Sequence, residues 1–341
     1  MYSFTNKKMR IFARILLFLV LLAVIYLVGP NPGDPVYNNS LPAVPTAPSL
    51  EKYISAKESM HNLRPDNEAR IVWANDSAKH KTAFSIVYLH GFSASQEEGD
   101  PVHREIAQSF GCNLFLSRLA QHGIDTSEQL MHLTADNYWE SAKEALAIGK
   151  QLGDKVILMG TSTGGSQALQ LAATFPSDIA ALILYSPNIA INDPNAWILN
   201  NPWGLQIARL VKGGKHNIPQ DTRPIYKQYW NSPYRLEAAV ALEEMLETTM
   251  TPETFEKINQ PVLMLYYYKD EQNQDRVVKV SAMKEMFGQL ATPANLKRSV
   301  ALPNTGDHVI ASPIKSKDII SVEKETKDFM LNVLQMPLSK D

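Results

Sequence analysis

A serine flanked by small residues stands where a strand is predicted to turn into a helix. The apolar run Val156–Met159 leads into GTSTG at residues 160–164, and a helical pattern follows. This G-x-S-x-G spacing is typical of a tight turn in which backbones approach closely and expose the Ser162 hydroxyl at a helix N-terminus. A phosphate-binding loop is the alternative interpretation, but residues 165–167 lack the lysine that it requires. We therefore expect Ser162 to be a nucleophile.

Backbone amides that could stabilise a developing oxyanion are predicted at two strand ends. The run Ile86–Leu89 leads into His90, Gly91 and Phe92. A serine that attacks a carbonyl group needs N–H donors aimed at the oxygen that becomes charged. We expect the amides of Phe92 and Thr163 to supply them, one from each loop. His90 and Gly91 are expected beside the substrate, with His90 bracing the loop rather than transferring a proton.

A histidine that could act as general base follows the last predicted strand. The run Val300–Leu302 leads through the turn PNTGD to His308. Of the eight histidines in the chain, only His308 combines a late position in the chain with a place after a strand. We expect it to take the proton of Ser162 and then to protonate the leaving group.

The elements that must position these residues alternate along the chain. Short apolar runs predict strands at Ile86–Leu89, Leu114–Leu116, Val156–Met159, Ala181–Tyr185 and Val262–Tyr268. Apolar residues spaced by three or four predict helices near 139–152, 167–175, 281–290 and 322–333. Strands buried on both faces and alternating with helices indicate a mostly parallel, doubly wound α/β sheet. Ligands of such sheets bind at the carboxyl ends of the strands, where all three motifs lie.

Taken together, the motifs resemble those of serine α/β-hydrolases, in the branch of carboxylesterases and monoacylglycerol lipases. The resemblance extends from about Ser85 to Leu334. It rests on HGFSAS at 90–95, GTSTGG at 160–165, DRVV at 275–278 and GDH at 306–308. The segment RLAQHG at 118–123 also resembles a motif of that branch, and His122 in it is expected to structure a loop. The resemblance implies an α/β-hydrolase fold, a Ser-acid-His triad, no cofactor and no metal.

The acid of this implied triad has three candidates, two of them aspartates. In the family, one aspartate both ends the strand after the cap and carries an Asp-x-Val-Val pattern. In this sequence Asp270 is at the strand end and Asp275 carries the pattern, with about five extra residues between them. We favour Asp275, because the spacing to the next helix fixes where the loop turns back towards His308. Asp270 is the alternative, and Glu271 is a distant third.

A helical cap is predicted before the acid-bearing strand. About 75 residues separate Tyr185 from Val262, far more than a plain crossover needs. The excess, about residues 188–250, contains three of the five tryptophans: Trp197, Trp203 and Trp230. Aromatic rings above a serine suit an apolar acyl group, and the same rings could also pack the cap onto the body. We expect a small-molecule or lipid ester as substrate.

The N-terminus carries a membrane signal. Residues 1–14 hold four basic and no acidic side chains, and Ile15–Val28 is uninterrupted apolar sequence. This order predicts an uncleaved signal anchor at residues 1–28, with a cytoplasmic N-terminus and a periplasmic or extracellular catalytic domain. A cleaved signal peptide and an accidental apolar stretch are the alternatives, although Tyr26–Pro30 is a poor cleavage site. Six prolines in residues 29–50 predict a tether that buries little, followed by a folded domain at 51–337.

Composition restricts the functions further. The chain of 341 residues has a net charge of −2, so the part after residue 14 is acidic at −6. That balance argues against nucleic-acid binding, which depends on neutralising phosphates with basic side chains. The expected function is cleavage of carboxylic esters by a serine hydrolase. An acyltransferase or a prolyl-type peptidase on the same fold is the alternative, and a non-catalytic binding protein is a weaker one.

Overall fold

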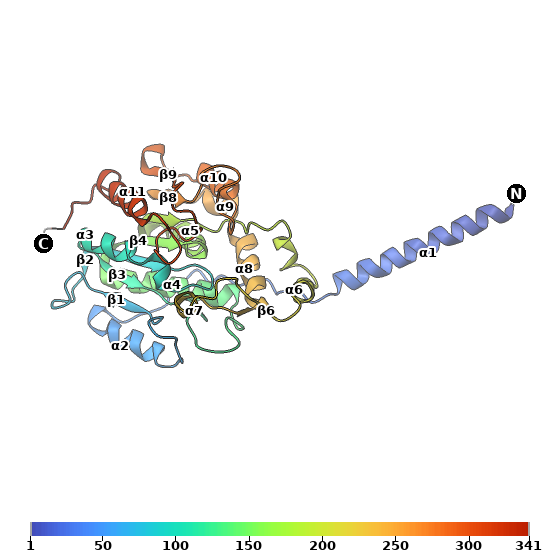
Figure 1. The fold of residues 1–341 in the computed structure, drawn as a ribbon, viewed down its shortest axis with the longest axis horizontal. Coiled ribbons are helices and arrows are strands. Elements are labelled where there is room, and N and C mark those ends of the chain that lie inside the picture. Colours follow the sequence, from blue (N-terminus) through green and yellow to red (C-terminus); the bar gives the residue numbers. More distant parts are fainter. Residues whose placement is uncertain (1, 340–341) are drawn as a thin grey trace.

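The computed structural model describes the backbone of residues 2–339, and its main body is built around a seven-stranded sheet of order β1-β3-β2-β4-β5-β8-β9 (Figure 1). The strands are β1 (Arg70–Val72), β2 (Thr82–Leu89), β3 (Asn113–Leu116), β4 (Gly153–Thr161), β5 (Ile179–Tyr185), β8 (Val262–Tyr266) and β9 (Lys297–Ala301). Only the edge strand β1 pairs antiparallel, with β3. The predicted doubly wound, mostly parallel sheet is therefore confirmed.

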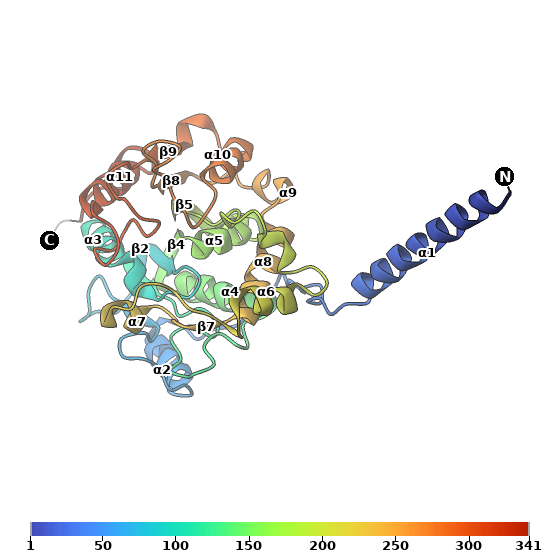
Figure 2. The same cartoon turned by 45° about the vertical axis from the view of Figure 1, so that its right-hand side comes forward.

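Helices cover both faces of the sheet (Figure 2). They include α3 (Val102–Ser109), α4 (Ala135–Leu152), α5 (Thr163–Thr174), α10 (Val280–Gln289) and α11 (Ile319–Asn332). Along β2, Ile86 and Tyr88 belong to the core shared with α3 and α11. Val87 and Leu89 belong to the core shared with α4 and α5. Because successive side chains point to opposite faces, the strand is buried on both sides and reads as a continuous apolar run.

The segment between β5 and β8 forms the predicted cap. It contains η3 (Ala196–Ile198), α6 (Gly204–Lys212), β6 (His216–Asn217), α7 (Pro224–Tyr229), β7 (Tyr234–Arg235), α8 (Leu236–Thr249) and α9 (Pro252–Phe255). Helix α8 packs against α6 on one side and α4 on the other. Its Leu242, Met245 and Leu246 belong to the same apolar core as α4 and α5. The cap is thus fixed to the body through α8.

The proline-rich segment differs from the expected free tether. Residues 29–46 are irregular but lie along the body, where Trp139 Nε1 donates to the carbonyl of Asn38 at 2.9 Å. Lys143 Nζ donates to the carbonyl of Ser40, also at 2.9 Å. Proline excludes helix and strand here, yet it leaves the carbonyl groups free to accept such bonds from α4.

The folded body also begins before the expected residue 51. Helix α2 (Ala47–Glu58) buries Leu50 completely in the apolar core. A proline in its first turn is compatible with a helix start, because the N–H groups there have no helical acceptor. The composition of this segment therefore concealed both its attachment to α4 and the start of α2.

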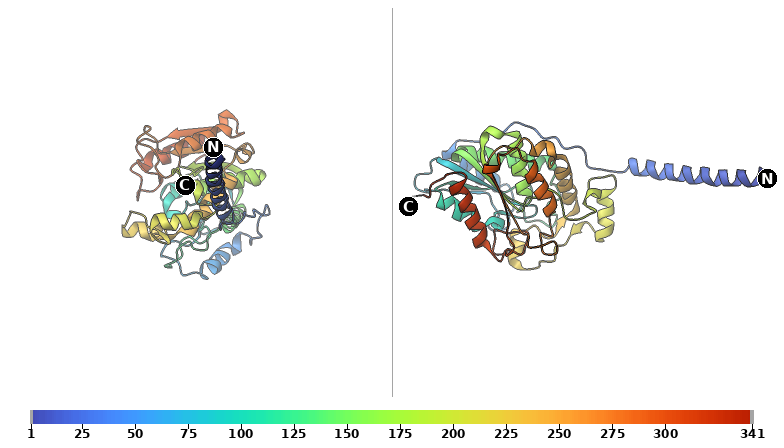
Figure 3. Two further views of the ribbon diagram at one scale, coloured as in Figure 1. Left: turned by 90° about the vertical axis from the view of Figure 1, so that its right-hand side faces the viewer. Right: turned by 90° about the horizontal axis from the view of Figure 1, so that it is seen from above.

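Helix α1 (Tyr2–Leu27) projects away from the body (Figures 1 and 3). Its part Lys7–Leu27 is long and apolar enough to cross a membrane, and none of it is buried within the described chain. The end of α1 is held to the start of α6, because Trp203 Nε1 donates to the carbonyl of Ile25 at 2.9 Å. The Trp203 amide also donates to the carbonyl of Pro30 at 2.9 Å.

Candidate active site

Ser162 occupies a strained turn between β4 and α5. Its φ of 54° and ψ of −121° lie in a region that residues other than glycine rarely adopt. The turn requires glycine at position 164, because a Cβ there would lie 1.9 Å from the carbonyl oxygen of Leu89. A Cβ at Gly160 would lie 2.5 Å from the carbonyl oxygen of Gly164. The two flanking glycines thus allow β2, β4 and α5 to converge on the serine.

Two backbone amides beside Ser162 have no acceptor. Neither the Phe92 nor the Thr163 N–H donates a hydrogen bond to another residue among residues 2–339. Thr163 is the first residue of α5, so its N–H also carries the positive end of the helix dipole. The structure therefore brings both predicted oxyanion donors to one cavity, which Phe92, Thr163 and Ser162 line together.

Two buried histidines hold the loop that carries Phe92. The Leu119 amide donates to His90 Nε2, and the Ser93 amide donates to His122 Nε2, each at 3.0 Å. Both rings therefore carry their proton on Nδ1, which bonds a nearby backbone carbonyl. Burial lowers the pKa of His90 to about 4, so this ring is neutral at physiological pH. His90 therefore stabilises the loop and does not line the cavity.

The structure brings Asp275 and His308 together in the interior. His308 Nδ1 donates to Asp275 Oδ2 at 2.6 Å, and both side chains are buried. The other carboxylate oxygen, Oδ1, accepts the amides of Val277 and Val278 at 2.8 and 3.1 Å. These three donors fix the carboxylate, which in turn fixes the orientation of the imidazole.

The second nitrogen of His308 is free. Nε2 is buried and makes no hydrogen bond among the described residues, so no such bond joins it to Ser162 Oγ. Both residues nevertheless line the same cavity. Burial lowers the pKa of His308, but the negative charges of Asp275, Glu98 and Asp307 raise it more, so that the net shift is upward from 6.5. The imidazole is thus a stronger base than an isolated one.

The alternative acids lie elsewhere. Asp270 is exposed, and its Oδ1 accepts the amides of Gln272 and Asn273 at 3.0 and 2.8 Å. Its neighbour Glu271 is also exposed and accepts the Tyr268 hydroxyl at 2.8 Å. The extra residues between the two aspartates form a local turn that projects outward, so that of the three candidates Asp275 is the one in contact with His308.

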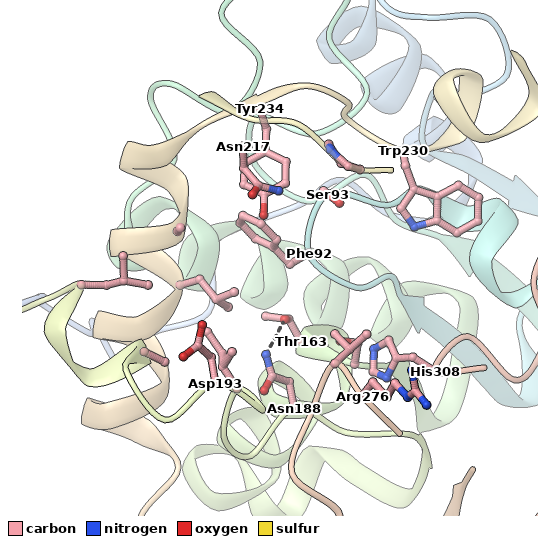
Figure 4. Close-up of a pocket in the computed structure, with 18 of the residues that line it drawn as sticks. Phe92, Ser93, Thr163, Asn188, Asp193, Asn217, Trp230, Tyr234, Arg276 and His308 are labelled. Carbon is pink, nitrogen blue, oxygen red and sulfur yellow. Dashed lines mark hydrogen bonds between the residues drawn. The ribbon is translucent and has the colours of Figure 1, made fainter. Parts of the chain in front are cut away.

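The cavity above the serine has a volume of about 1030 Å³ and extends to both sides of Thr163 (Figure 4). Trp230 and His308 lie on one side of Thr163, and Asp193 lies on the other. Apolar side chains of η3, α6 and α8 line the part on the Asp193 side: Ile198, Leu199, Ile207, Ala208, Val211 and Leu242. Around His308 the lining includes Asp307, Lys315, which pairs with Asp307, and Tyr226, which stacks on Trp230.

Several residues predicted at the substrate site lie outside this lining. Trp230 lines the cavity, whereas Trp197 is half exposed and Trp203 faces the end of α1. His90 and Gly91 are buried behind the loop. The expectation rested on residue type alone, and an aromatic ring in a cap packs wherever apolar surface meets it.

Sequence reasoning missed other residues of the cavity. Glu98 lies in η1 (Gln96–Gly99), eight positions after His90, with no recognisable motif. Asn188, after β5, directs its Nδ2 to Thr163 Oγ1 at 3.5 Å. Its place after a parallel strand was the one signal that could have found it. Among residues 2–339 no group of three or more His, Cys, Asp or Glu side chains is arranged to hold a metal ion.

Several solved structures have a similar fold. A structure reported for the metagenome-derived lipolytic enzymes LipS and LipT is similar, with a TM-score of 0.63 and 16% identity, covering 79% of this chain and 98% of that one. A monoacylglycerol lipase from Paleococcus ferrophilus has a TM-score of 0.57 and 14% identity, covering 77% and 97%. Est1E from Butyrivibrio proteoclasticus, with ferulic acid bound, has a TM-score of 0.54 and 18% identity, covering 79% and 95%.

All three identities are below 25%, so the similar structures establish the fold but not the activity. The sequence model of the Alpha/beta hydrolase family matches residues 86–315, more than half of the chain. That range begins in β2, before the loop that carries Phe92, and ends after His308. The chain belongs to the alpha/beta hydrolase family.

Proposed function

We propose that this protein is a serine hydrolase that cleaves carboxylic esters through Ser162, Asp275 and His308. The observation that carries the proposal is the cavity itself. It joins a strained serine, two unoccupied amides and a histidine whose Nδ1 is tied to a buried carboxylate. The lipases and esterases among the structures of similar fold support ester hydrolysis as the reaction class.

The proposed reaction follows from these groups. Ser162 Oγ attacks the ester carbonyl as His308 Nε2 takes its proton, and Asp275 stabilises the imidazolium that forms. The amides of Phe92 and Thr163 bind the resulting oxyanion. His308 then protonates the departing alcohol, which leaves an acyl-enzyme. Water, deprotonated by His308, releases the acid and restores the serine.

The alcohol and the acyl chain of the ester bind on opposite sides of Thr163 in this proposal. The leaving alcohol must lie beside His308, because that residue protonates it. The acyl chain then extends towards the apolar surface between η3, α6 and α8. Burial of methylene groups there favours binding by about 0.8 kcal/mol for each CH₂. We therefore infer a preference for medium or long acyl chains.

The test is hydrolysis of p-nitrophenyl esters from acetate to palmitate by the full chain in detergent micelles. We expect turnover with all of the shorter esters and a kcat/KM that rises with acyl length to at least eight carbons. Product analysis by mass spectrometry, with an added alcohol as competing acceptor, separates a hydrolase from an acyltransferase. Turnover of a prolyl amide substrate with no ester hydrolysis would instead favour a peptidase.

We further propose that α1 anchors the protein in a membrane, with the N-terminus cytoplasmic and the catalytic domain periplasmic or extracellular. The basic residues before the apolar run support this orientation. The surface of the cap next to α1 supports the anchoring. Leu210 is 83% exposed and lines a groove with Leu22 and Ile25 of α1, and Ile218, 77% exposed, directly follows β6, which packs against α6. The hydrogen bond from Trp203 to Ile25 holds α6 near the end of the apolar helix (Figure 1).

Replacing both exposed residues, Leu210→Glu with Ile218→Glu, tests whether this surface rests on lipid. Two charges on this surface oppose its contact with acyl chains, so hydrolysis of a long-chain ester embedded in phosphatidylcholine vesicles should fall at least about fivefold. Hydrolysis of water-soluble p-nitrophenyl butyrate should change less than about twofold, since neither side chain lines the cavity.

Ile320→Glu provides the matched control. Ile320 is 76% exposed on α11, at the other end of the body from α1 (Figure 1). It should leave both rates unchanged. Equal loss on vesicles from the control and the double variant would contradict a specific membrane face on α6.

A further inference from the structure

A buried carboxyl group stands beside the nucleophile and has no part in the proposed triad. Glu98 is 2% exposed and lines the same cavity as Ser162 and His308. A Cβ added to Gly91 would lie 2.9 Å from both Glu98 carboxyl oxygens and 2.9 Å from Ser162 Cβ. The carboxyl group and the nucleophile therefore flank the same glycine, and no larger residue fits between them.

Only one oxygen of this carboxyl group is occupied. The Gly91 amide donates to Oε2 at 2.6 Å. Oε1 receives no hydrogen bond within residues 2–339 and remains accessible from the cavity. Withdrawing a carboxyl group from water is unfavourable unless its oxygens find partners. A free oxygen beside the reacting serine is thus placed to receive a donor from the substrate.

The position of Glu98 identifies which part of the substrate it meets. Glu98 belongs to η1, which packs against α7, and Ala94 of the same loop packs with Trp230 and with Val309, the neighbour of His308. Glu98 and His308 therefore lie on the same side of the cavity. His308 is the residue that protonates the leaving alcohol. The aliphatic lining of η3, α6 and α8 receives the acyl chain on the other side of Thr163 (Figure 4). Glu98 therefore faces the alcohol.

We propose that Glu98 is a specificity-determining residue whose free oxygen accepts a hydrogen bond from a second hydroxyl group on the leaving alcohol. The substrate class is accordingly an ester of a polyhydroxylated alcohol. Burial raises the pKa of Glu98 to about 7, so near neutrality the carboxyl group can pair with a neutral hydroxyl in either protonation state.

A cationic alcohol fits this end of the cavity less well. Lys315 lines the same part and lies 5.6 Å from the centre of the Tyr226 ring, which stacks on Trp230. Its ammonium group pairs with Asp307 at 3.4 Å and would repel a second cation. The charges around Glu98 thus favour a neutral hydroxyl over an ammonium group.

The experiment compares esters of one acid with different alcohols. Glyceryl monobutyrate and propyl butyrate share the acyl group and a three-carbon alcohol, and differ in two hydroxyls. The proposal, which rests on the proposed ester hydrolysis, predicts that the full chain prefers the glyceryl ester in kcat/KM. In Glu98→Leu this preference should fall at least about tenfold, because the hydrogen bond to the second hydroxyl group is lost.

The ratio of the two rates separates specificity from loop structure. Losing the bond from the Gly91 amide would disturb the loop that carries Phe92 and slow the hydrolysis of both esters alike, which leaves the ratio of their rates unchanged. Glu98→Gln keeps an oxygen for that amide and turns its NH₂ group towards the substrate hydroxyl. It should therefore retain more of the preference than Glu98→Leu does. Glu97→Gln is the matched control, because Glu97 is adjacent but does not line the cavity.

The outcomes are distinct. An unchanged ratio in both Glu98 variants, or a wild-type preference for propyl butyrate, would overturn the proposal while leaving ester hydrolysis intact. Preference for butyrylcholine over the uncharged 3,3-dimethylbutyl butyrate, lost in Glu98→Leu, would overturn it in favour of a cation site. If the wild-type protein hydrolyses no ester at all, the proposed function itself fails, and this inference fails with it.

Discussion

Replacing Ser162 with alanine is expected to lower kcat for ester hydrolysis by about 10⁴-fold or more, because no other group can form the acyl-enzyme. The variant should fold as the wild type does. Ser162 Oγ makes no hydrogen bond among the described residues, and the turn is set by backbone contacts and by the flanking glycines. Steady-state kinetics with p-nitrophenyl butyrate, together with thermal unfolding, measure the two effects separately.

Ser177→Ala serves as the control for Ser162→Ala. Ser177 is exposed in η2 (Pro176–Asp178), away from the cavity, and its replacement should leave kcat unchanged. A fluorophosphonate probe should label the wild type and the control and fail to label Ser162→Ala. Turnover near the wild-type rate in a clean Ser162→Ala preparation would remove Ser162 from the mechanism.

Replacing Asp275 with asparagine is expected to lower kcat by about 10⁴-fold through the wrong histidine tautomer. The amides of Val277 and Val278 hold one oxygen of this side chain, so the asparagine oxygen would stay there. Its NH₂ group would then face His308 Nδ1, which must become the acceptor. The ring proton moves to Nε2, and this nitrogen can no longer take the proton of Ser162.

The pH dependence of the rate is a second test of the contact between Asp275 and His308. Catalysis requires neutral His308, so the rate falls as the pH is lowered through its pKa. Although burial lowers that pKa, the charges of Asp275, Glu98 and Asp307 raise it more, and the acidic limb should have its midpoint above 6.5. Without the Asp275 charge, the residual activity of Asp275→Asn should show its midpoint at lower pH.

Asp270→Asn is the matched control for both measurements. Asp270 is exposed in the local turn and accepts hydrogen bonds there through Oδ1, as an asparagine also would. Its rate and pH midpoint should equal those of the wild type. A large loss of activity in Asp270→Asn together with normal activity in Asp275→Asn would exchange the roles of the two aspartates.

The sequence by itself predicted the fold class correctly, because the relevant signals are local. The buried strands read as apolar runs, and the helix from Thr163 follows β4 within two residues. The tight turn at Ser162 needs glycines at fixed neighbouring positions, and a motif of five residues records that need. Both predicted amide donors also follow from local geometry, since each stands directly after a parallel strand.

The sequence pattern predicted the structure less well where the surroundings of a segment depend on residues far away in the chain. Proline content made residues 29–50 look like a free tether, but carbonyl groups of that segment accept hydrogen bonds from Trp139 and Lys143, which lie about a hundred positions further on. Likewise, Trp203 was expected in the substrate site and instead contacts the end of α1. Residue type gives the tendency to be buried but not the surface against which burial occurs.

Which aspartate contacts His308, and what surrounds the serine, were decided only by the tertiary structure. Asp270 and Asp275 are five positions apart and chemically equal, and the choice depends on a turn that directs one outward and the other to His308. Glu98 carries no motif, and the close packing around Gly91 brings it beside Ser162. The physical reason is common to both cases: a strand or turn is set by neighbours in sequence, whereas the environment of a carboxyl group is set by whatever the fold brings against it.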